Sequence, residues 1–424
     1  MLPGVGARVL HAAGAMATSP RAEEPEPASR KLGKHGHSSQ SRSSWASFDS
    51  LADLTIPLSP VEAAERALEK AVLLLSLALR LWSYLGLGYK WLLQVYRLCL
   101  YAMLLLPGFA QMVFYYFLSP RVQRNIPYGR KPRQVLDLYV PKAAGQDGQL
   151  APVVVFVTGG AWTIGYKAWG AILGRRLCEA GVMVACLDYR NFPQGDALQM
   201  VEDVNTGIAW VTRRVERYGG DPEAVHLVGQ SAGGQLALLA LLNQAAQAAT
   251  GEAVLGAAPV WHPLDVKAFV GVSGAYDLEG LAEHLHRRGL YRSLLDTIMS
   301  VEGAVAYGVL SPLAYARALA KDDPGVGRFL PPALLLHGTA DKSVPAAGSV
   351  LMHDALERLE VPVSYRLFEG KTHTDFLLED AFRGGKDDLT DAILELVTGR
   401  PHAGRHRTMC PRPLVWLASR VCPF

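Results

Sequence analysis

The residues best suited to chemistry lie between Val225 and Leu236, where a short apolar run ends at a glycine and a serine follows among small residues. The pattern Gly229-x-Ser231-x-Gly233 is that of a nucleophile elbow, a sharp strand-to-helix turn that presents the serine hydroxyl above a sheet. Strand and helix approach so closely there that only glycine fits on either side of the serine. A glycine-rich loop with an ordinary serine is the alternative, and the flanking strand-like and helix-like runs favour the elbow.

A serine hydroxyl becomes a strong nucleophile only when a base accepts its proton. In an architecture built around such an elbow, the acid and then the histidine follow the serine along the chain. Asp341 follows the apolar run 333–337, and His373 follows the run 363–368. We therefore expect His373 to act as general base and later as general acid, and Asp341 to orient its ring and stabilise the imidazolium.

Other side chains compete for these two roles. The competing histidines are expected inside a strand, at a strand end or in an insertion: His226, His337, His284 and His286. The competing acids lie close to His373 in the sequence: Glu369 and Asp375. Only His373 has both the chain order and the strand-end position, and the Gly-Thr-Ala-Asp loop favours Asp341. Asp188 precedes the serine and is expected to be structural.

An ester-cleaving site also needs donors for the oxyanion, and the segment 158–162 directly follows the apolar run 153–157. Successive glycines leave backbone N–H groups able to turn toward the site. We expect the amides of Gly160 and Ala161 to form the hole with that of Ala232; an ordinary glycine turn is the alternative. The neighbouring residues assigned to the same site are Gly159, Trp162 and Gln230. Trp162 either lines the pocket or only anchors the loop.

From about residue 133 to 399, short apolar runs alternate with helical patterns, which predicts an α/β fold with a mostly parallel sheet and helices on both faces. The expected strands are 134–140, 153–157, 183–187, 225–228, 268–272, 333–337 and 363–368. The expected helices are 172–180, 199–218, 231–245 and 347–359. Active sites then lie beyond the carboxyl ends of the strands. The long interval 276–329 predicts a lid over the site.

Composition narrows the function classes. The 424 residues carry 42 basic and 39 acidic side chains, a net charge of +3 that gives no argument for a nucleic-acid partner. Five cysteines are scattered without metal-type spacing. We therefore expect reduced thiols, no metal and no cofactor.

The amino-terminal part differs from the catalytic domain, which we place at 121–400. Residues 1–58 predict a disordered tail, with a transit peptide as the alternative. Residues 59–120 predict membrane-associated helices, because 98–118 is a run of 21 uncharged residues, close to the ~20 that cross a bilayer. Pro107 and Gly108 would kink it. A buried or amphipathic helix packed on the enzyme is the alternative, and 71–96 is either a second span or an interfacial helix.

Basic residues near the predicted span indicate its orientation. Arg80, Lys90 and Arg97 precede it, and a larger group follows: Arg121, Arg124, Arg130, Lys131 and Arg133. This small bias predicts that the catalytic domain faces the cytosol. The basic, proline-rich tail 401–424 receives no function.

Taken together, these motifs resemble the α/β-hydrolase superfamily, near carboxylesterases with an HGG-type oxyanion loop, and most of all plant isoprenylcysteine α-carbonyl methylesterases. The resemblance covers about residues 60–400, including the apolar segment before the hydrolase domain. It is carried by VTGGAW at 157–162, GYKAW at 165–169, LDYRN at 187–191 and GQSAGG at 229–234. Thr158 departs from wider relatives, which have histidine there, but agrees with the methylesterases.

This resemblance implies hydrolysis of the methyl ester of a C-terminal prenylcysteine, with release of methanol. It also implies a location in the endoplasmic reticulum or Golgi membrane, so the expected partners are a prenylated protein or prenylcysteine methyl ester and the lipid bilayer. A broader carboxylesterase or arylformamidase with the same triad remains open. A non-catalytic hydrolase-fold receptor is the alternative from another class.

Overall fold

The computed structural model describes residues 72, 89–251, 261–289, 292–402 and 404–423. The predicted tail 1–58 and most of the stretch 59–88 lie outside the described residues.

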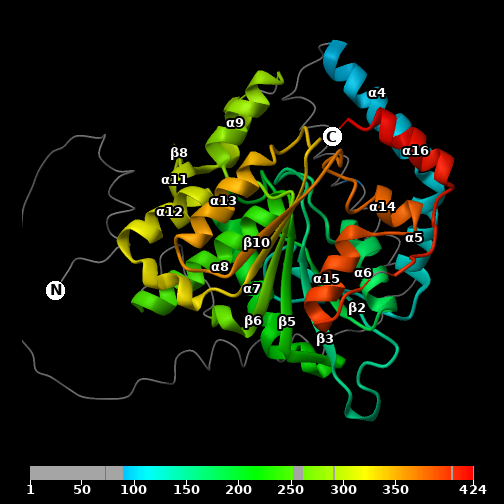
Figure 1. Ribbon diagram of the computed structural model, residues 1–424, viewed down its shortest axis with the longest axis horizontal. Helices are drawn as coiled ribbons and strands as arrows, with labels where there is room; N and C mark the ends of the chain where they lie inside the picture. The colour runs from blue at the N-terminus through cyan, green and yellow to red at the C-terminus, as the bar shows by residue number, and fades with distance from the viewer. Residues whose placement is uncertain (1–71, 73–88, 252–260, 290–291, 403, 424) are drawn as a thin grey trace, which may run out of the picture.

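A mostly parallel eight-stranded sheet forms the centre of the molecule (Figure 1), in the order β1-β2-β4-β3-β5-β6-β9-β10. The strands from β4 to β10 run parallel, and β2 pairs antiparallel with both β1 and β4. Their bounds are β1 Val122–Pro127, β2 Val135–Tyr139, β3 Ala151–Val157, β4 Met183–Leu187, β5 Gly220–Gln230, β6 Val266–Val272, β9 Ala333–Gly338 and β10 Val363–Phe368. This confirms the predicted α/β-hydrolase fold class.

One strand, β1, is missing from the sequence-based prediction. It lies at the sheet edge, and its Gln123, Arg124 and Asn125 are exposed. A short edge strand with polar residues lacks the apolar run that identifies buried strands.

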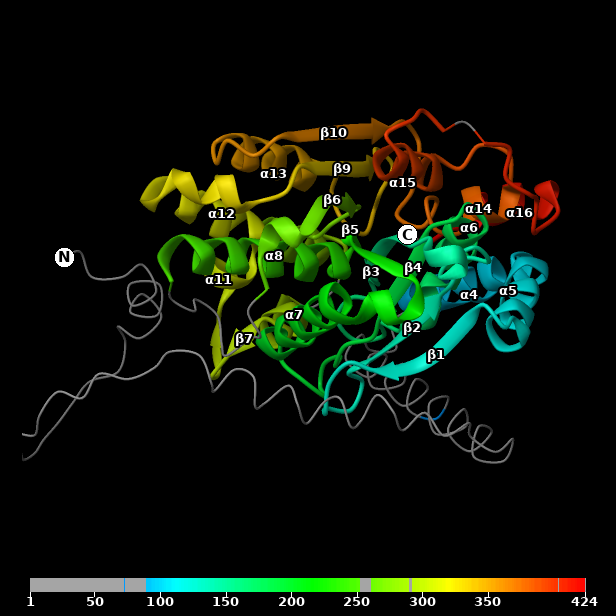
Figure 2. The same ribbon diagram turned by 90° about the horizontal axis from the view of Figure 1, so that it is seen from below.

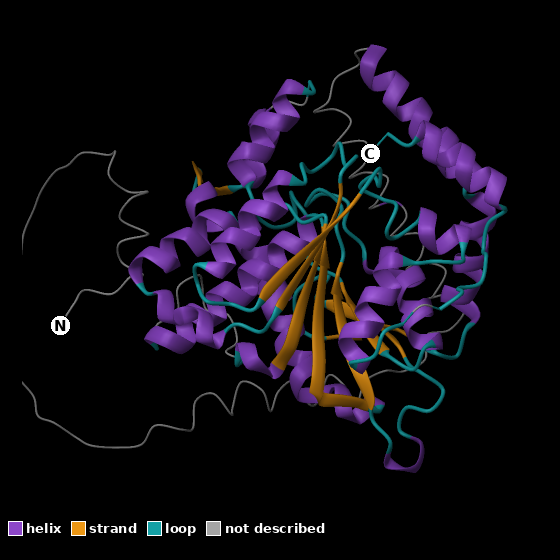
Figure 3. Ribbon diagram, viewed as in Figure 1, coloured by secondary structure: helices purple, strands orange, loops and turns teal. Residues whose placement is uncertain are grey.

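Helices cover both faces of the sheet (Figure 3). One face packs against α7 (Ala197–Arg214), α8 (Ala232–Thr250), α12 (Pro312–Asp322) and α13 (Ala347–Glu357). The other packs against α6 (Ala171–Glu179), α15 (Asp388–Thr398), α4 (Tyr89–Leu104), α5 (Leu106–Leu118) and α16 (Arg412–Val421). Side chains of β3 alternate between the two cores: Val153, Val155 and Val157 point into the first, and Val154 and Phe156 into the second. This alternation is the period of two of an extended strand, with both sides buried.

The interval predicted as a lid, 276–329, holds mainly short elements. They are α9 (Leu278–Arg287), α10 (Arg292–Ile298), the hairpin β7 (Ser300–Val301) with β8 (Ala304–Val305), α11 (Tyr307–Leu310), α12 and the 3-10 helix η5 (Pro324–Phe329). Of these, α12 packs on α8 and α13 and so belongs to the core. Figure 1 shows α9 projecting beyond the carboxyl ends of the strands. A lid function for this interval stays a prediction.

The predicted span 98–118 is divided between two helices, α4 (Tyr89–Leu104) and α5 (Leu106–Leu118), which bend by 66° at Leu105. Pro107 and Gly108 follow the break directly, where the sequence predicts a kink. Among the described residues no single helix is long and apolar enough to cross a bilayer, although the bent pair meets the same criteria together. One side of the pair packs on the hydrolase domain through Tyr101 and Met112.

The carboxyl-terminal tail also folds onto the domain. Its apolar piece forms α16 (Arg412–Val421), which lies beside α4 at one edge of the molecule (Figure 1). Before it, the short helix α14 (Glu379–Arg383) follows the loop after β10. Two segments far apart in the sequence, α4 and α16, therefore lie side by side on one side of the sheet.

Candidate active site

Ser231 lies at the sharp turn between β5 and α8, in the strained conformation of φ 56° and ψ −123°. Its amide donates to the carbonyl of Val272 at 2.9 Å, which fixes the turn against β6. A Cβ on Gly233 would lie 2.1 Å from the carbonyl oxygen of Val157, and one on Gly229 would lie 2.6 Å from that of Gly233. Backbone contacts this close explain why the turn needs glycine at both positions.

The structure brings the three residues of the predicted triad into one hydrogen-bonded chain. The hydroxyl of Ser231 donates to Nε2 of His373 at 2.9 Å, and Nδ1 of His373 donates to Oδ2 of Asp341 at 2.6 Å. Each side chain follows the carboxyl end of a strand: β5, β10 and β9 respectively. These strands run parallel in one sheet, so their carboxyl ends meet at one edge. This is the geometry of a serine activated by a histidine base.

Asp341 is held as a carboxylate. Its Oδ1 accepts the amides of Ser343 at 2.8 Å and Val344 at 2.9 Å. Burial by itself would raise its pKa, but the facing His373 and the hydrogen bonds from the two histidine rings hold the pKa of Asp341 well below its usual range. A charged Asp341 favours the imidazolium that forms when His373 accepts a proton.

His337, considered above as a competing base, lies behind Asp341 instead. Its Nε2 is 3.1 Å from Oδ2 of Asp341 and 3.0 Å from the carbonyl oxygen of Val344. Both are acceptors, so Nε2 carries the proton, and Nδ1 accepts the hydroxyl of Ser349 at 2.7 Å. This role was not predicted from the sequence. The sequence feature that indicates it is the pattern His-Gly-x-x-Asp, in which a histidine ends the strand that precedes the acid.

We expect replacement of His337 by leucine to lower kcat about tenfold with KM unchanged, because Asp341 loses a donor and its orientation. Steady-state kinetics checks the kcat value, and thermal unfolding measures any loss of stability separately. His286→Leu, on the lid interval, is the matched control and should leave kcat intact. Equal kcat values for the two variants would contradict the positioning role.

The predicted oxyanion loop lies against the serine. A Cβ on Gly159 would come within 2.8 Å of Cβ of Ser231. Gly160, Ala161 and Trp162 have φ values of 129°, 48° and 59°, which turn this stretch of backbone away from an extended path. In the described part of the chain, the amides of Gly160 and Ala161 donate to no protein oxygen. Ala232 begins α8, so its amide also lacks an intrahelical acceptor.

Two further predicted site residues flank this loop. The indole of Trp162 is buried and donates to Oε1 of Gln235 at 2.9 Å, and Gln235 donates to the carbonyl of Leu310 at 2.7 Å. Of the two alternatives for Trp162, this position corresponds to anchoring the loop. The amide Nε2 of Gln230 lies 3.4 Å from Nε2 of His373. Gln230 therefore lies between the oxyanion loop and the histidine.

Glu379 contacts the loop that carries His373 through a hydrogen bond with Thr374. No role for Glu379 was predicted from the sequence. This carboxyl group is fully buried, accepts the hydroxyl of Thr374 at 3.1 Å and is also bonded by that of Tyr101. Burial, and then the nearby charge of Asp375, raise the pKa of Glu379 to about 8. The group is therefore mostly protonated at neutral pH.

A pH dependence of stability follows for Glu379. The folded protein holds this proton more tightly than the unfolded chain, so the free energy of unfolding falls as pH rises from about 4.5 to about 8. The fall is at most about 1.4 kcal/mol for each pH unit. Glu379→Gln should flatten the slope in urea unfolding measured across this range, whereas the exposed Glu369→Gln should retain it. An unchanged slope in Glu379→Gln would contradict the buried, protonated state.

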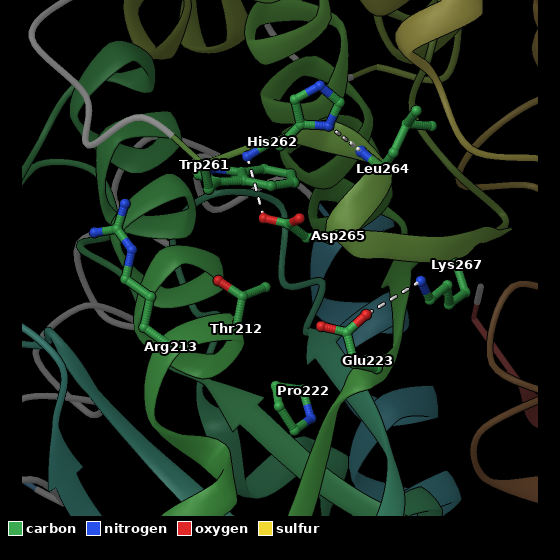
Figure 4. Close-up of a pocket in the computed structure, with 9 residues that line it drawn as sticks. All are labelled: Thr212, Arg213, Pro222, Glu223, Trp261, His262, Leu264, Asp265 and Lys267. Carbon is green, nitrogen blue, oxygen red and sulfur yellow. Dashed lines mark hydrogen bonds and ion pairs between the residues drawn. The ribbon is translucent and has the colours of Figure 1, made fainter.

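A separate pocket of about 420 Å³ lies at the other end of the strands (Figure 4). Its lining comes from the end of α7, the start of β5, and the start of β6 with the segment just before it, which includes the 3-10 helix η4 (Pro263–Asp265): Thr212, Arg213, Pro222, Glu223, Trp261, His262, Leu264, Asp265 and Lys267. Because the triad follows the carboxyl ends of the strands, this pocket is no part of the site.

The sheet order, the strand-to-helix serine and the loops at the strand ends define an esterase of the α/β-hydrolase class. The BD-FAE family model matches residues 136–356, about half of the chain. The chain is 46% identical over 370 residues to the probable isoprenylcysteine alpha-carbonyl methylesterase ICMEL1 of Oryza sativa subsp. japonica, covering 85% of this chain and 84% of that protein. It is 43% identical to isoprenylcysteine alpha-carbonyl methylesterase ICME of Arabidopsis thaliana, covering 84% of this chain and 83% of that protein. Esterase LipC of Mycobacterium tuberculosis (strain ATCC 25618 / H37Rv) is 30% identical, with 62% of each chain covered.

The chain therefore belongs to the isoprenylcysteine alpha-carbonyl methylesterase family and is a carboxylic ester hydrolase.

Proposed function

We propose that this esterase hydrolyses the methyl ester of a C-terminal prenylcysteine through Ser231, His373 and Asp341. The observation that carries the mechanism is the hydrogen-bonded chain from Ser231 through His373 to Asp341. The substrate is proposed from the names of the relatives, which match most of the chain.

In the proposed reaction, Oγ of Ser231 attacks the ester carbonyl carbon as Nε2 of His373 takes the hydroxyl proton. The amides of Gly160, Ala161 and Ala232 hold the oxyanion of the tetrahedral intermediate. When the intermediate collapses, the carbon–oxygen bond to the methoxy group breaks and His373 protonates the leaving oxygen, which departs as methanol. Water, deprotonated by the same ring, then attacks the acyl carbon. As the bond from this carbon to Oγ of Ser231 breaks, His373 returns the proton to Oγ, which regenerates the serine and releases the prenylcysteine acid, which ionises to its carboxylate.

The enzyme is proposed to work at the endoplasmic reticulum or Golgi membrane with its catalytic domain in the cytosol. A prenyl chain partitions into the bilayer, so attachment there raises the rate of encounter with such a substrate. The exposed apolar side chains of α4 and α5 support this proposal, Met103 and Leu118 among them. Fractionation of cells that express the full chain tests the location: recovery in the soluble fraction alone would count against it.

The test of substrate class compares kcat/KM for a prenylated cysteine methyl ester with that for the unprenylated ester, in the presence of intact membranes. We expect at least a tenfold preference for the prenylated ester, about the lower end of what one buried methylene group supplies. Equal values would favour the broader carboxylesterase. Failure of a fluorophosphonate probe to label Ser231 would favour the non-catalytic receptor.

A further inference from the structure

Three neighbouring helices, α4 and α5 before the hydrolase domain and α16 after it, carry large exposed apolar side chains, and we call their exposed sides together the docking face. It consists of the solvent-facing sides of α4, α5 and α16. Among its most exposed side chains are Tyr96, Met103, Leu106, Phe114, Leu118 and Trp416, each between 57% and 74% exposed. Figure 1 shows α4, α5 and α16 along one edge of the molecule, and Figure 2 shows them gathered at one end. So many large exposed apolar groups on three neighbouring helices indicate a partner that removes them from water.

The charges around this face fit a lipid headgroup layer. The sequences of α4, α5 and α16 contain no acidic residue. Two arginines lie over aromatic rings of these helices: Cζ of Arg124 is 5.0 Å from the ring centroid of Phe117, and that of Arg420 is 4.8 Å from the ring centroid of Trp416. A long basic side chain beside an aromatic ring can reach the headgroups while its stem and the ring contact acyl chains. A bilayer with anionic lipids therefore fits both the apolar and the basic parts of the face.

The inward side of the same helices is bound to the hydrolase domain by polar contacts. The hydroxyl of Tyr116 donates to Asp137 at 2.5 Å, and Asp137 forms a fully buried ion pair with Lys167 at 2.6 Å. Gln111 of α5 donates to the carbonyl of Met409 at 2.5 Å. If α5 left the domain to cross a bilayer, the ion pair would lose its cover and Tyr116 its partner.

The length of α5 also argues against a bilayer-crossing helix. The 13 residues of α5 extend about 20 Å, less than the roughly 30 Å of a hydrocarbon core. The 66° bend at Leu105 turns α4 out of line with it. Both helices and α16 can, however, lie along a membrane surface with their apolar sides down.

The helices that carry the docking face contact the loop of His373 through their inward sides. Tyr101 of α4 lies 3.2 Å from the hydroxyl of Thr374, and the sulfur of Cys422, just after α16, lies 3.6 Å from that hydroxyl. Arg97 of α4 donates to the carbonyl of Cys422 at 2.9 Å, which joins the two helices. Thr374 directly follows His373, so the inward sides of these helices contact the loop that carries His373.

We propose that α4, α5 and α16 together dock in the plane of an anionic bilayer without crossing it, with α16 as an integral part of the contact. The delivery of a prenyl chain from that bilayer to Ser231 rests on the proposed function, whereas the docking itself does not.

The test uses the full chain with a fluorescent nitrobenzoxadiazole label. Cys99 of α4 is the exposed cysteine among the described residues, and the other four cysteines are buried. Two further variants carry the label on α5 and α16, each in a Cys99→Ser background: Phe117→Cys and Trp416→Cys. Leu264→Cys in the same background is the matched control, because Leu264 is 44% exposed at the opposite end of the strands. Each protein is added to sealed vesicles of phosphatidylcholine and phosphatidylserine, so the catalytic domain stays outside.

We expect a blue shift of the label at Cys99, Phe117→Cys and Trp416→Cys, and none at Leu264→Cys. Dithionite, which does not cross the bilayer, should bleach the labels at Cys99 and Phe117→Cys to the same extent. Protection of Cys99 with bleaching at Phe117→Cys would show a crossing helix and overturn the proposal. Sedimentation with vesicles without a blue shift at the α16 label would also overturn it. Hydrolysis of a water-soluble ester in the same samples reports catalysis separately, so loss of docking and failure of the proposed reaction are distinguishable.

Discussion

Replacing Ser231 by alanine is expected to lower kcat about 10⁶-fold, because no other group in the site can form the acyl-enzyme. The hydroxyl that donates to His373 is lost, while the turn remains, since alanine is as small as serine and the backbone bonds at this position do not involve the side chain. Methanol release from a prenylcysteine methyl ester measures the loss. Thermal unfolding of the variant should stay close to that of the parent.

Ser273 provides a matched control for this experiment. It directly follows the neighbouring strand β6, is fully buried and has a similar positive φ of 47°. Ser273→Ala should retain activity within about twofold, as substitutions that leave the reacting groups untouched commonly do. A Ser231→Ala protein that still releases methanol at the parental rate would refute the serine mechanism.

Replacing Asp341 by asparagine is expected to lower kcat about 10⁴-fold. The amide cannot stabilise the imidazolium, and its NH₂ group can hold the ring of His373 with the wrong nitrogen protonated. The effect should be large because Oδ2 receives His373 at 2.6 Å in a site where Asp341 is 9% exposed. Single-turnover kinetics with a chromogenic ester measures the acylation step directly.

The competing acid Glu369 serves as the control for Asp341. Glu369 is exposed just after β10, and Glu369→Gln should leave acylation unchanged. If Glu369→Gln slowed acylation and Asp341→Asn did not, the assignment of the orienting acid would be wrong.

Local patterns were sufficient to predict most of the sheet and the serine, acid and histidine side chains that the structure brings together. The elbow is recognisable because the close backbone contacts of Gly229 and Gly233 impose glycine at fixed positions around Ser231. Buried strands such as β3 are recognisable because both of their sides are apolar. By contrast, β1 could not be found, since an edge strand with exposed polar residues has no such pattern.

For the helices α4, α5 and α16, local patterns were not sufficient. The run 98–118 has the composition of a membrane span. Composition does not reveal that Phe382 packs against Gly108 and Phe109, or that the side-chain amide of Gln111 donates a hydrogen bond to the carbonyl of Met409. An apolar helix side looks the same in sequence whether lipid or protein covers it. The role of α16, assigned no function from the sequence, likewise depends on its contact with α4.

The sequence by itself determined which groups are present and their order: a serine in a glycine turn, then an acid and a histidine at strand ends, and a glycine loop before them. Only the tertiary structure decided how they pair. His373 is hydrogen-bonded to Ser231, from which it is separated by 142 positions in the sequence. Asp341 is also hydrogen-bonded by a second histidine, His337, which the sequence had suggested as a competing base. The physical reason is that a turn depends on a few neighbouring residues, whereas a long-range hydrogen bond depends on the order in which the strands pack into the sheet.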